Sequence, residues 1–386
     1  MNDLKGSIKW LPGLVLGLVC IACSPGSNQA DTPAEGEQAT RLLIIGQDLG
    51  AIRGYYESAC CIQPDGNTAY VNLYNVLSEQ EQFSGLGIDN EGKKLETEAD
   101  FGTGPLNMYK TATEFSGGLA IGLELAENRH PDALNLLIAG EYDEHIAQLA
   151  HFLKMVEVPV WLRIGYEFDG AWNRGYEDSE KYKTAYRRVV EKLRLANVAN
   201  VEYVWQSGTS PVDDVIDGGH EDISKWYPGD EYVDWMGMSL FLSLDEKPVA
   251  EMEFEPPTQR DLMEEVLAFA RARGKPVMIA EASPQGYDLA NRSNANIAPI
   301  WDGKQKGDLK IISDQEIWEN WFAPLFQYMN ENDDVIRALA YINANWDAQP
   351  RWGKPHAEGY WGDSRLEANS EIAGRFNRAI TQWRDR

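Results

Sequence analysis

Eight short apolar segments, separated by stretches with helical periodicity, restrict how this sequence can fold more than any other feature. A short, nearly continuous apolar run is typical of a strand buried on both faces, as in a parallel sheet that helices cover. The predicted strands are 42–45, 68–74, 118–125, 158–164, 201–205, 233–241, 276–280 and 336–342.

The stretches between these strands place apolar residues at i, i+3, i+4 and i+7, the spacing of a helix with one buried face. Such series begin at Ile146, Tyr182, Leu262, Trp318 and Ile372. Eight strands alternating with helices favour a (β/α)8 TIM barrel of the α/β class over an open doubly wound sheet, because no glycine-rich phosphate loop follows the first strand. We therefore predict one barrel domain over residues 41–386.

The N-terminal segment is typical of export. Lys5 and Lys9 precede an apolar run that ends at Cys23, and a polar, acidic stretch follows. This resembles a bacterial lipoprotein signal, so we predict a signal peptide over 1–23, a flexible tether over 24–40 and lipidation of Cys23. The chain would then be an outer-membrane lipoprotein that touches the membrane only through its lipid. An ordinary signal peptide is the alternative.

If Cys23 carries lipid, the adjacent Cys60 and Cys61 are left in an oxidising compartment, where thiols tend to pair. Neighbouring cysteines close only a strained ring. A vicinal disulfide and two separate thiols both stay open.

The charge balance restricts the partners. With 35 Lys and Arg against 61 Asp and Glu, the net charge is −26, which repels nucleic acid and strongly anionic polysaccharides at long range. A neutral polysaccharide or oligosaccharide is the expected partner, and we expect a monomer. The five histidines form no H-E-x-x-H pair, and there is no G-x-S-x-G or Walker-type loop. We expect neither a metal nor another cofactor.

Two glutamates lie at the C-terminal ends of predicted buried strands. Glu167 follows the fourth predicted strand and Glu281 the seventh. In a barrel the C-terminal ends of all strands meet at one mouth, so both carboxylates would share a cleft. Retaining glycosidases use two carboxyl groups about 5–5.5 Å apart as proton donor and nucleophile. We assign Glu167 as acid/base and Glu281 as nucleophile.

Residues 162–173, with the sequence LRIGYEFDGAWN, resemble the acid/base segment of glycoside hydrolase family 26, the β-mannanase family of the retaining barrel clan. Further matches follow in order at 138–143, 182–189, 200–205, 227–239 and 275–281, and the resemblance spans 138–346. It implies the same roles for Glu167 and Glu281. Tyr166 and Phe241 depart from the family pattern, which usually has His before the acid/base and often Tyr at the end of strand six.

The resemblance implies hydrolysis of a β-linked neutral polysaccharide with retention, with β-1,4-mannan as the first expectation. Because Tyr166 and Phe241 lie beside the bond to be cut, β-1,3/1,4-glucan, β-1,3-xylan and an unusual algal glycan are alternatives. A surface glycan-binding lipoprotein without catalysis is the alternative of another class.

Other polar and aromatic residues lie close to predicted strand ends. Indole faces stack on sugar rings, so we place Trp172, Trp205 and Trp346 in the cleft, while core packing is the structural alternative for each. Arg163 could hold a carboxylate or serve as a structural arginine, and Gln206 could bind a sugar hydroxyl. Weaker candidates for hydroxyl binding are Asp48, Asn345, Asp347 and Gln349.

Overall fold

The computed structural model describes residues 40–77, 85–245, 254–295, 309–353 and 360–386. The predicted signal peptide, Cys23 and the tether up to residue 39 lie outside these ranges. None of the helices described is long and apolar enough to cross a membrane.

Eight parallel strands close into a barrel in which each strand pairs with its neighbours in chain order and the last pairs with the first. The register runs from Leu42 opposite Ala338 to Gly46 opposite Ile342 at the closing seam. The predicted barrel and its eight strands are confirmed. Their bounds are β1 (Leu42–Gly46), β2 (Gly66–Asn72), β5 (Gly118–Glu124), β6 (Val160–Ile164), β7 (Val201–Ser207), β8 (Trp235–Leu240), β9 (Val277–Ala282) and β13 (Ile336–Ile342).

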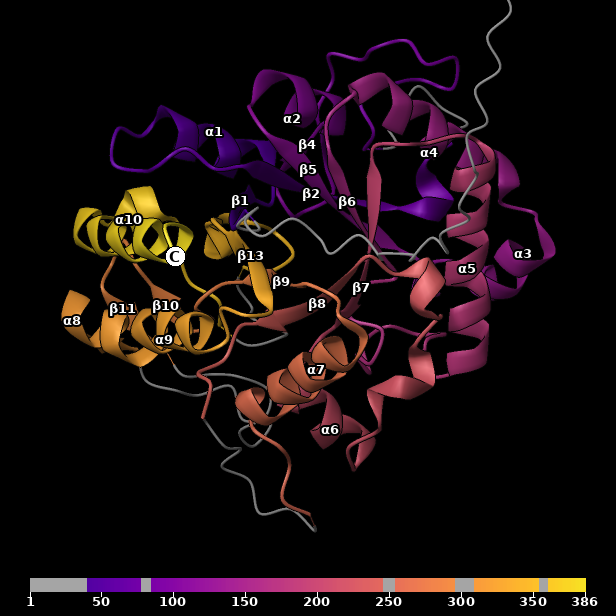
Figure 1. Cartoon of the computed structure of the whole chain (residues 1–386). Helices are drawn as coiled ribbons and strands as arrows, with labels where there is room; N and C mark the ends of the chain where they lie inside the picture. Colours follow the sequence, from indigo (N-terminus) through magenta and orange to yellow (C-terminus); the bar gives the residue numbers. More distant parts are fainter. Residues whose placement is uncertain (1–39, 78–84, 246–253, 296–308, 354–359) are drawn as a thin grey trace, which may run out of the picture. The chain divides into compact units, whose positions relative to one another are not determined.

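Helices surround the barrel (Figure 1). The five predicted helical series fall within the helical segments 143–156, 179–195, 259–273, 314–331 and 370–384. The α-helices are α1 (Leu49–Glu57), α2 (Met108–Glu114), α3 (Ala133–Ala139), α4 (Asp143–Val156), α5 (Ser179–Leu195), α6 (Pro211–Asp217), α7 (Gln259–Arg273), α8 (Asp314–Ile317), α9 (Ala323–Glu331) and α10 (Ser370–Arg384).

The 314–331 segment differs from the single helix that its periodicity predicts. A π-helical turn, Trp318–Phe322, separates α8 from α9. Pro324 is the second residue of α9. Because proline has no backbone N–H and its ring crowds the preceding turn, it disturbs the regular hydrogen-bond ladder at this point.

The loops outside the barrel contain short strands and 3-10 turns. Two small antiparallel sheets consist of β3 (Ala99–Asp100) with β4 (Pro105–Leu106), and of β10 (Tyr287–Asp288), β11 (Ser293–Asn294) and β12 (Lys310–Ile311). The 3-10 turns are η1 (Leu73–Asn75), η2 (Ile223–Trp226), η3 (Asp230–Tyr232), η5 (Trp346–Ala348) and η6 (Leu366–Ala368).

Alternation along the strands divides the core into two layers. A small cluster fills the barrel interior, with residues such as Ile44, Val204 and Met278. A larger cluster occupies the space between the strands and the helices, where Leu162 and Ile279 lie. Each strand residue therefore faces either the barrel axis or the helix layer, and this decides which side chains can reach the mouth.

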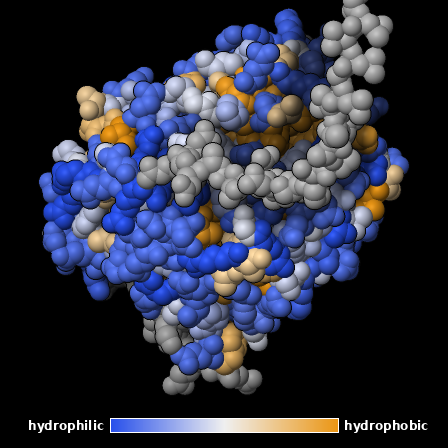
Figure 2. Space-filling model, viewed as in Figure 1, coloured by the Kyte–Doolittle hydropathy of each residue, from blue (hydrophilic) through white to orange (hydrophobic). Residues whose placement is uncertain are grey.

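The face of the molecule seen in Figure 2 is mostly hydrophilic, with smaller apolar areas, in keeping with the net charge of −26.

Between α1 and β2, the sulfur atoms of Cys60 and Cys61 lie 3.0 Å apart, and both residues are free thiols in this structure.

Candidate active site

Four neighbouring strands each bring one polar side chain into the barrel interior, near the C-terminal ends of the strands. Arg163 lies on β6, Gln206 on β7, Ser239 on β8 and Glu281 on β9. Arg163, Gln206 and Ser239 have no exposed surface, and Glu281 is 7% exposed. Glu167 follows three residues after the end of β6 and is 9% exposed. The barrel therefore brings together the two carboxylates that the sequence singles out.

A bulge in β9 turns Glu281 toward the barrel axis. Val277 and Ile279 face the helix layer, and strict alternation would send Glu281 the same way. The pairing with β8 shifts, however, because Met238 opposes Ile279 whereas the next residue, Ser239, opposes Glu281. The extra residue on β9 re-aims the side chain, a known use of bulges near active sites.

Arg163 compensates the charge of Glu281. Its Nη1 lies 2.5 Å from Oε1 of Glu281 and donates a second hydrogen bond of 3.0 Å to Oε1 of Gln206. Gln206 in turn donates from Nε2 to Glu281 Oε1 at 3.3 Å. The guanidinium also lies over the rings of Tyr70, at 4.8 Å, and Tyr166, at 5.4 Å. A buried carboxylate needs such a charged, hydrogen-bonded partner.

Glu167 has two hydrogen-bond donors of its own. Ser239 Oγ donates to Oε1 at 2.8 Å, and the indole Nε1 of Trp172 donates to Oε2 at 3.0 Å. Burial, followed by the nearby charge of Glu281, raises the pKa of Glu167 to about 8. The group therefore holds its proton near neutral pH.

A continuous hydrogen-bonded path joins the two carboxyl groups. Gln206 Nε2, which contacts Glu281, also donates to Ser239 Oγ at 3.1 Å, and Ser239 donates to Glu167. Arg163 and its partners thus stabilise a negative charge on one glutamate, while the other is kept protonated by burial. A protonated acid beside an ionised carboxylate is the pairing that glycosidic bond cleavage uses.

The turn that carries Glu167 has an unusual backbone. Glu167 adopts φ 53° and Gly165 φ 54°, in the left-handed region that non-glycine residues rarely occupy. Asn173 Nδ2 donates to the Glu167 carbonyl at 2.8 Å, and the hydroxyl of Tyr182 lies 3.1 Å from the carbonyl of Gly165. These contacts fix a conformation that is otherwise unfavourable, as is common at functional sites.

Several predicted substrate-binding residues lie close to this pair. The indole of Trp172 is 36% exposed beside Glu167. Trp346 is buried and donates to Ser283 Oγ, two residues from Glu281, at 3.1 Å. Tyr166 packs edge-on against Tyr70, and Phe241 packs edge-on against Trp361. Sugar binding by Trp172, Trp346, Tyr166 and Phe241 stays a prediction.

The prediction that places Trp205 in the cleft requires correction. Trp205 is 1% exposed and stacks on Phe168 at 4.2 Å, with Tyr227 and Phe269 around it. It alternates along β7 with the interior-facing Val204 and Gln206, so its indole points into the helix layer. The structural alternative of core packing describes this residue.

The weaker hydroxyl-binding candidates have internal partners. Asp48 caps α1 by accepting from Ala51 N at 3.0 Å, and it accepts from Gln349 Nε2 at 3.2 Å. Asn345 caps the turn η5 through Ala348 N. Asp347 lies in η5, and its side chain forms a hydrogen bond with Tyr360. The side chains of all four residues therefore make contacts within the protein.

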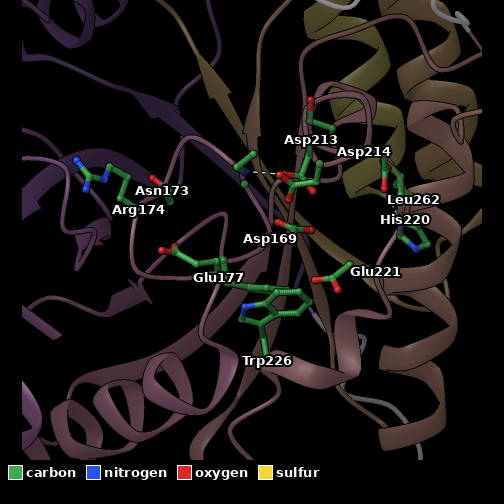
Figure 3. A pocket seen from close by; sticks show the side chains of 15 residues that line it. Asp169, Asn173, Arg174, Glu177, Asp213, Asp214, His220, Glu221, Trp226 and Leu262 are labelled. Atoms are coloured by element: carbon green, nitrogen blue, oxygen red, sulfur yellow. Dashed lines mark hydrogen bonds and ion pairs between the residues drawn. The ribbon is translucent and has the colours of Figure 1, made fainter. Parts of the chain in front are cut away.

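A cavity of about 280 Å³ lies behind the turn that carries Glu167. It is formed by residues of that turn and by α6 with the segment after it, and neither catalytic candidate lines it. Figure 3 shows the carboxylates of Asp169, Asp213 and Asp214 near one another at this cavity. Burial raises the pKa of Asp213 to about 8, and the charge of Asp169 adds to the effect.

Ser239 and Tyr70 belong to the site but were not identified from the sequence. Ser239 had a signal: it is a polar residue at an interior-facing position of an apolar strand, two residues before the strand-end Phe241. Tyr70 had none, because an aromatic residue in a buried strand is usually core.

Comparison with known proteins identifies a matching family model and similar relatives. The model for "Glycosyl hydrolase family 26" matches residues 124–287, which include both glutamates. A β-1,3-xylanase from Alcaligenes sp is 31% identical over 369 residues, covering 94% of this chain and 66% of the relative. The β-1,3-xylanase TXYA from Vibrio sp is 32% identical over 342 residues, covering 88% of this chain and 64% of the relative.

The chain thus spans about two thirds of the length of these two relatives. Among solved structures, a family 26 β-mannanase from Bacteroides ovatus is similar with a TM-score of 0.53 and 13% identity, covering 89% of each chain. At that identity the likeness concerns the barrel fold alone.

Proposed function

This chain belongs to glycosyl hydrolase family 26, and from that premise we propose that it is a retaining glycoside hydrolase of a neutral β-linked polysaccharide, with β-1,3-xylan as its substrate. Glu167 is the acid/base and Glu281 the nucleophile. The observation that carries the proposal is the hydrogen-bonded path from Glu281 through Gln206 and Ser239 to Glu167.

In the first step, the Glu281 carboxylate attacks the anomeric carbon while the bond from that carbon to the glycosidic oxygen breaks. Glu167 gives its proton to the departing oxygen, so the leaving sugar ends as a neutral alcohol. The guanidinium of Arg163, 2.5 Å from the Glu281 carboxylate, compensates its negative charge before the attack. The raised pKa of Glu167 keeps the required proton in place near neutral pH.

In the second step, Glu167 accepts a proton from water, the water oxygen attacks the anomeric carbon, and Glu281 leaves as a carboxylate. The charge of Glu281 is one cause of the raised pKa of Glu167. Ester formation removes that charge, so the pKa of Glu167 falls when the residue must act as a base. The two inversions give net retention.

Two observations favour β-1,3-xylan over the β-1,4-mannan first expected. Both relatives described above are named β-1,3-xylanases. Phe241, where many family members have Tyr, offers no hydroxyl beside the bond to be cut, and Tyr166 replaces the usual His. Both changes alter the subsite that discriminates one sugar from another.

The test is incubation of the enzyme with β-1,3-xylan, β-1,4-mannan and β-1,3/1,4-glucan, with product size and anomeric configuration followed by chromatography and proton NMR. We expect β-configured products from β-1,3-xylan. Initial α-products would overturn the retaining mechanism. Cleavage of mannan or glucan alone would overturn the substrate.

The variant Glu281→Ala separates an enzyme from a glycan-binding protein. An enzyme loses hydrolysis and keeps most of its affinity for the polysaccharide, whereas a binder without catalysis shows no hydrolysis in either form. Glu180→Gln is the matched control, because the side chain of Glu180 is 80% exposed on α5.

We also propose that the chain is exported and lipidated at Cys23, as its N-terminal sequence predicts. Metabolic labelling with a fatty acid tests this. Label that is present in the full chain and absent from Cys23→Ser supports the anchor, and absence of label from the full chain contradicts it.

A further inference from the structure

We propose that Ser239 is a positioning residue that holds the acid/base Glu167 in both of its protonation states. This inference rests on the proposed function, since it concerns the proton that Glu167 donates and recovers. It starts from the two hydrogen bonds of the Ser239 hydroxyl, one to Glu167 and one from Gln206.

The backbone fixes Ser239 firmly. Its Cα opposes that of Glu281 across β8 and β9, and the side chain has no exposed surface. The carbonyl oxygen of Ser239 accepts from Thr209 Oγ1 at 2.5 Å and from Gln259 Nε2 at 2.9 Å. Three elements, β7 with its following loop, β8 and α7, therefore determine where the hydroxyl lies.

The two partners of Glu167 differ in what they can do. Trp172 contributes an indole N–H, which only donates. Ser239 contributes a hydroxyl, which donates to a carboxylate and can accept from a carboxylic acid. When Glu167 gains a proton on Oε1, the Ser239 hydroxyl can turn and accept that hydrogen bond. Ser239 can thus follow the change in protonation, and Trp172 cannot.

Gln206 supports this role. Its Nε2 donates to Ser239 Oγ at 3.1 Å and to Glu281 at 3.3 Å. It can lie there because Gly237 stands opposite on β8: a Cβ at residue 237 would come within 2.8 Å of Gln206 Cβ. The serine oxygen therefore keeps one fixed donor while its own hydrogen changes direction.

The experiment compares the wild type with Ser239→Ala, Ser239→Thr and the buried-serine control Ser293→Ala. Each is assayed on β-1,3-xylan, whose leaving sugar needs a proton, and on a 2,4-dinitrophenyl β-xylobioside, whose leaving group does not. With Ser239→Ala we expect kcat/KM to fall about 10- to 100-fold on the polysaccharide and less than about 3-fold on the activated substrate. Ser239→Thr restores the hydroxyl and should recover most of the activity.

The pH profile provides a readout that a merely structural role would not move. The hydrogen bond that Ser239 donates to the ionised carboxylate is stronger than the one it can accept from the neutral acid. Ser239 therefore lowers the pKa of Glu167, and its loss should shift the alkaline limb of kcat/KM to higher pH. An equal loss on both substrates, an unchanged limb, or failure of Ser239→Thr to recover activity would overturn the inference.

A measurement without turnover keeps this test separate from the proposed function. Carbon-13 NMR titration of the Glu167 carboxyl should give a higher pKa in Ser239→Ala than in the wild type, and an unchanged pKa would contradict the role of Ser239. Inactivity of the wild type on every glycan would count against the proposed function alone. Thermal unfolding of each variant confirms that it is folded.

Discussion

The guanidinium of Arg163 and the carboxylate of Glu281 form a buried contact of 2.5 Å between residues 118 positions apart in the chain. Among the residues that the structure describes, neither group forms a second ion pair, and Arg163 has no exposed surface. Each group therefore compensates the charge of the other. Replacement of either residue by an uncharged one would leave the remaining charge buried without a partner.

Replacement of Arg163 by Met should leave the Glu281 charge buried and uncompensated. We expect kcat to fall about 10²- to 10³-fold and the free energy of unfolding to fall by about 3–5 kcal/mol, measured by steady-state kinetics and denaturant unfolding. Arg188→Met is the control, since Arg188 pairs with Asp143 in a partly exposed bridge of small value. Similar losses in both variants would contradict a special role for Arg163.

The pH dependence of activity should show an alkaline limb near pH 8. In the proposed mechanism, activity requires protonated Glu167. Burial together with the charge of Glu281 raises its pKa to about 8, so the active fraction falls as pH rises through that value. In Glu281→Gln the repelling charge is gone, and an NMR titration should give a lower pKa for Glu167. A pKa that is unchanged in this variant would mean that the two carboxyl groups do not interact.

Gly165→Ala should destabilise the turn that carries Glu167. Its Cβ would come within 2.7 Å of Tyr182 Cε2, and Tyr182 is fully buried. Gly274→Ala is a matched control, because Gly274 has a similar positive φ of 64° and nothing within 4 Å of an added Cβ. Gly165→Ala should cost about 1–3 kcal/mol more than the control in chemical unfolding. Equal costs would show that the turn can adapt.

Asp213→Asn should stabilise the protein at alkaline pH. The pKa of Asp213 in the folded state is raised to about 8 from 3.8. The stability that this carboxyl contributes is therefore present below about pH 4 and is lost as pH rises towards 8. The amide has no charge to lose and its oxygen can still accept from Ala171 N. We expect Tm to rise by about 1–3 °C at pH 8 and to stay unchanged near pH 4.

Asp385→Asn, at the exposed end of α10, is the control for this measurement. A gain for Asp213→Asn that is as large at pH 4 as at pH 8 would point to a cause other than ionisation.

The barrel and its two glutamates were predictable because both depend on local patterns. Apolar strands such as 336–342 coincide with the observed β13, and Glu167 and Glu281 stand at strand ends that topology brings to one mouth. Arg163 was predicted near a carboxylate, but the sequence did not say which one.

The remaining features depend on tertiary structure. The orientation of Glu281 depends on a bulge that alternation does not reveal, and the inward or outward direction of Trp205 follows from the register of β7. The role of Ser239 required the distances to Glu167 and Gln206. The pattern of residue types locates the strands. The direction in which a single side chain points depends on how the strands pair with one another.

Four consecutive strands, β6 to β9, supply Arg163, Gln206, Ser239 and Glu281, so the spacing of these groups is inherited from the regular separation of paired strands. Segments beyond the strand tips can lengthen, shorten or be exchanged while that spacing persists. Bond breaking and the choice of glycan can therefore diverge independently in evolution, and a designer could graft new rim segments onto this scaffold without rebuilding its reactive centre.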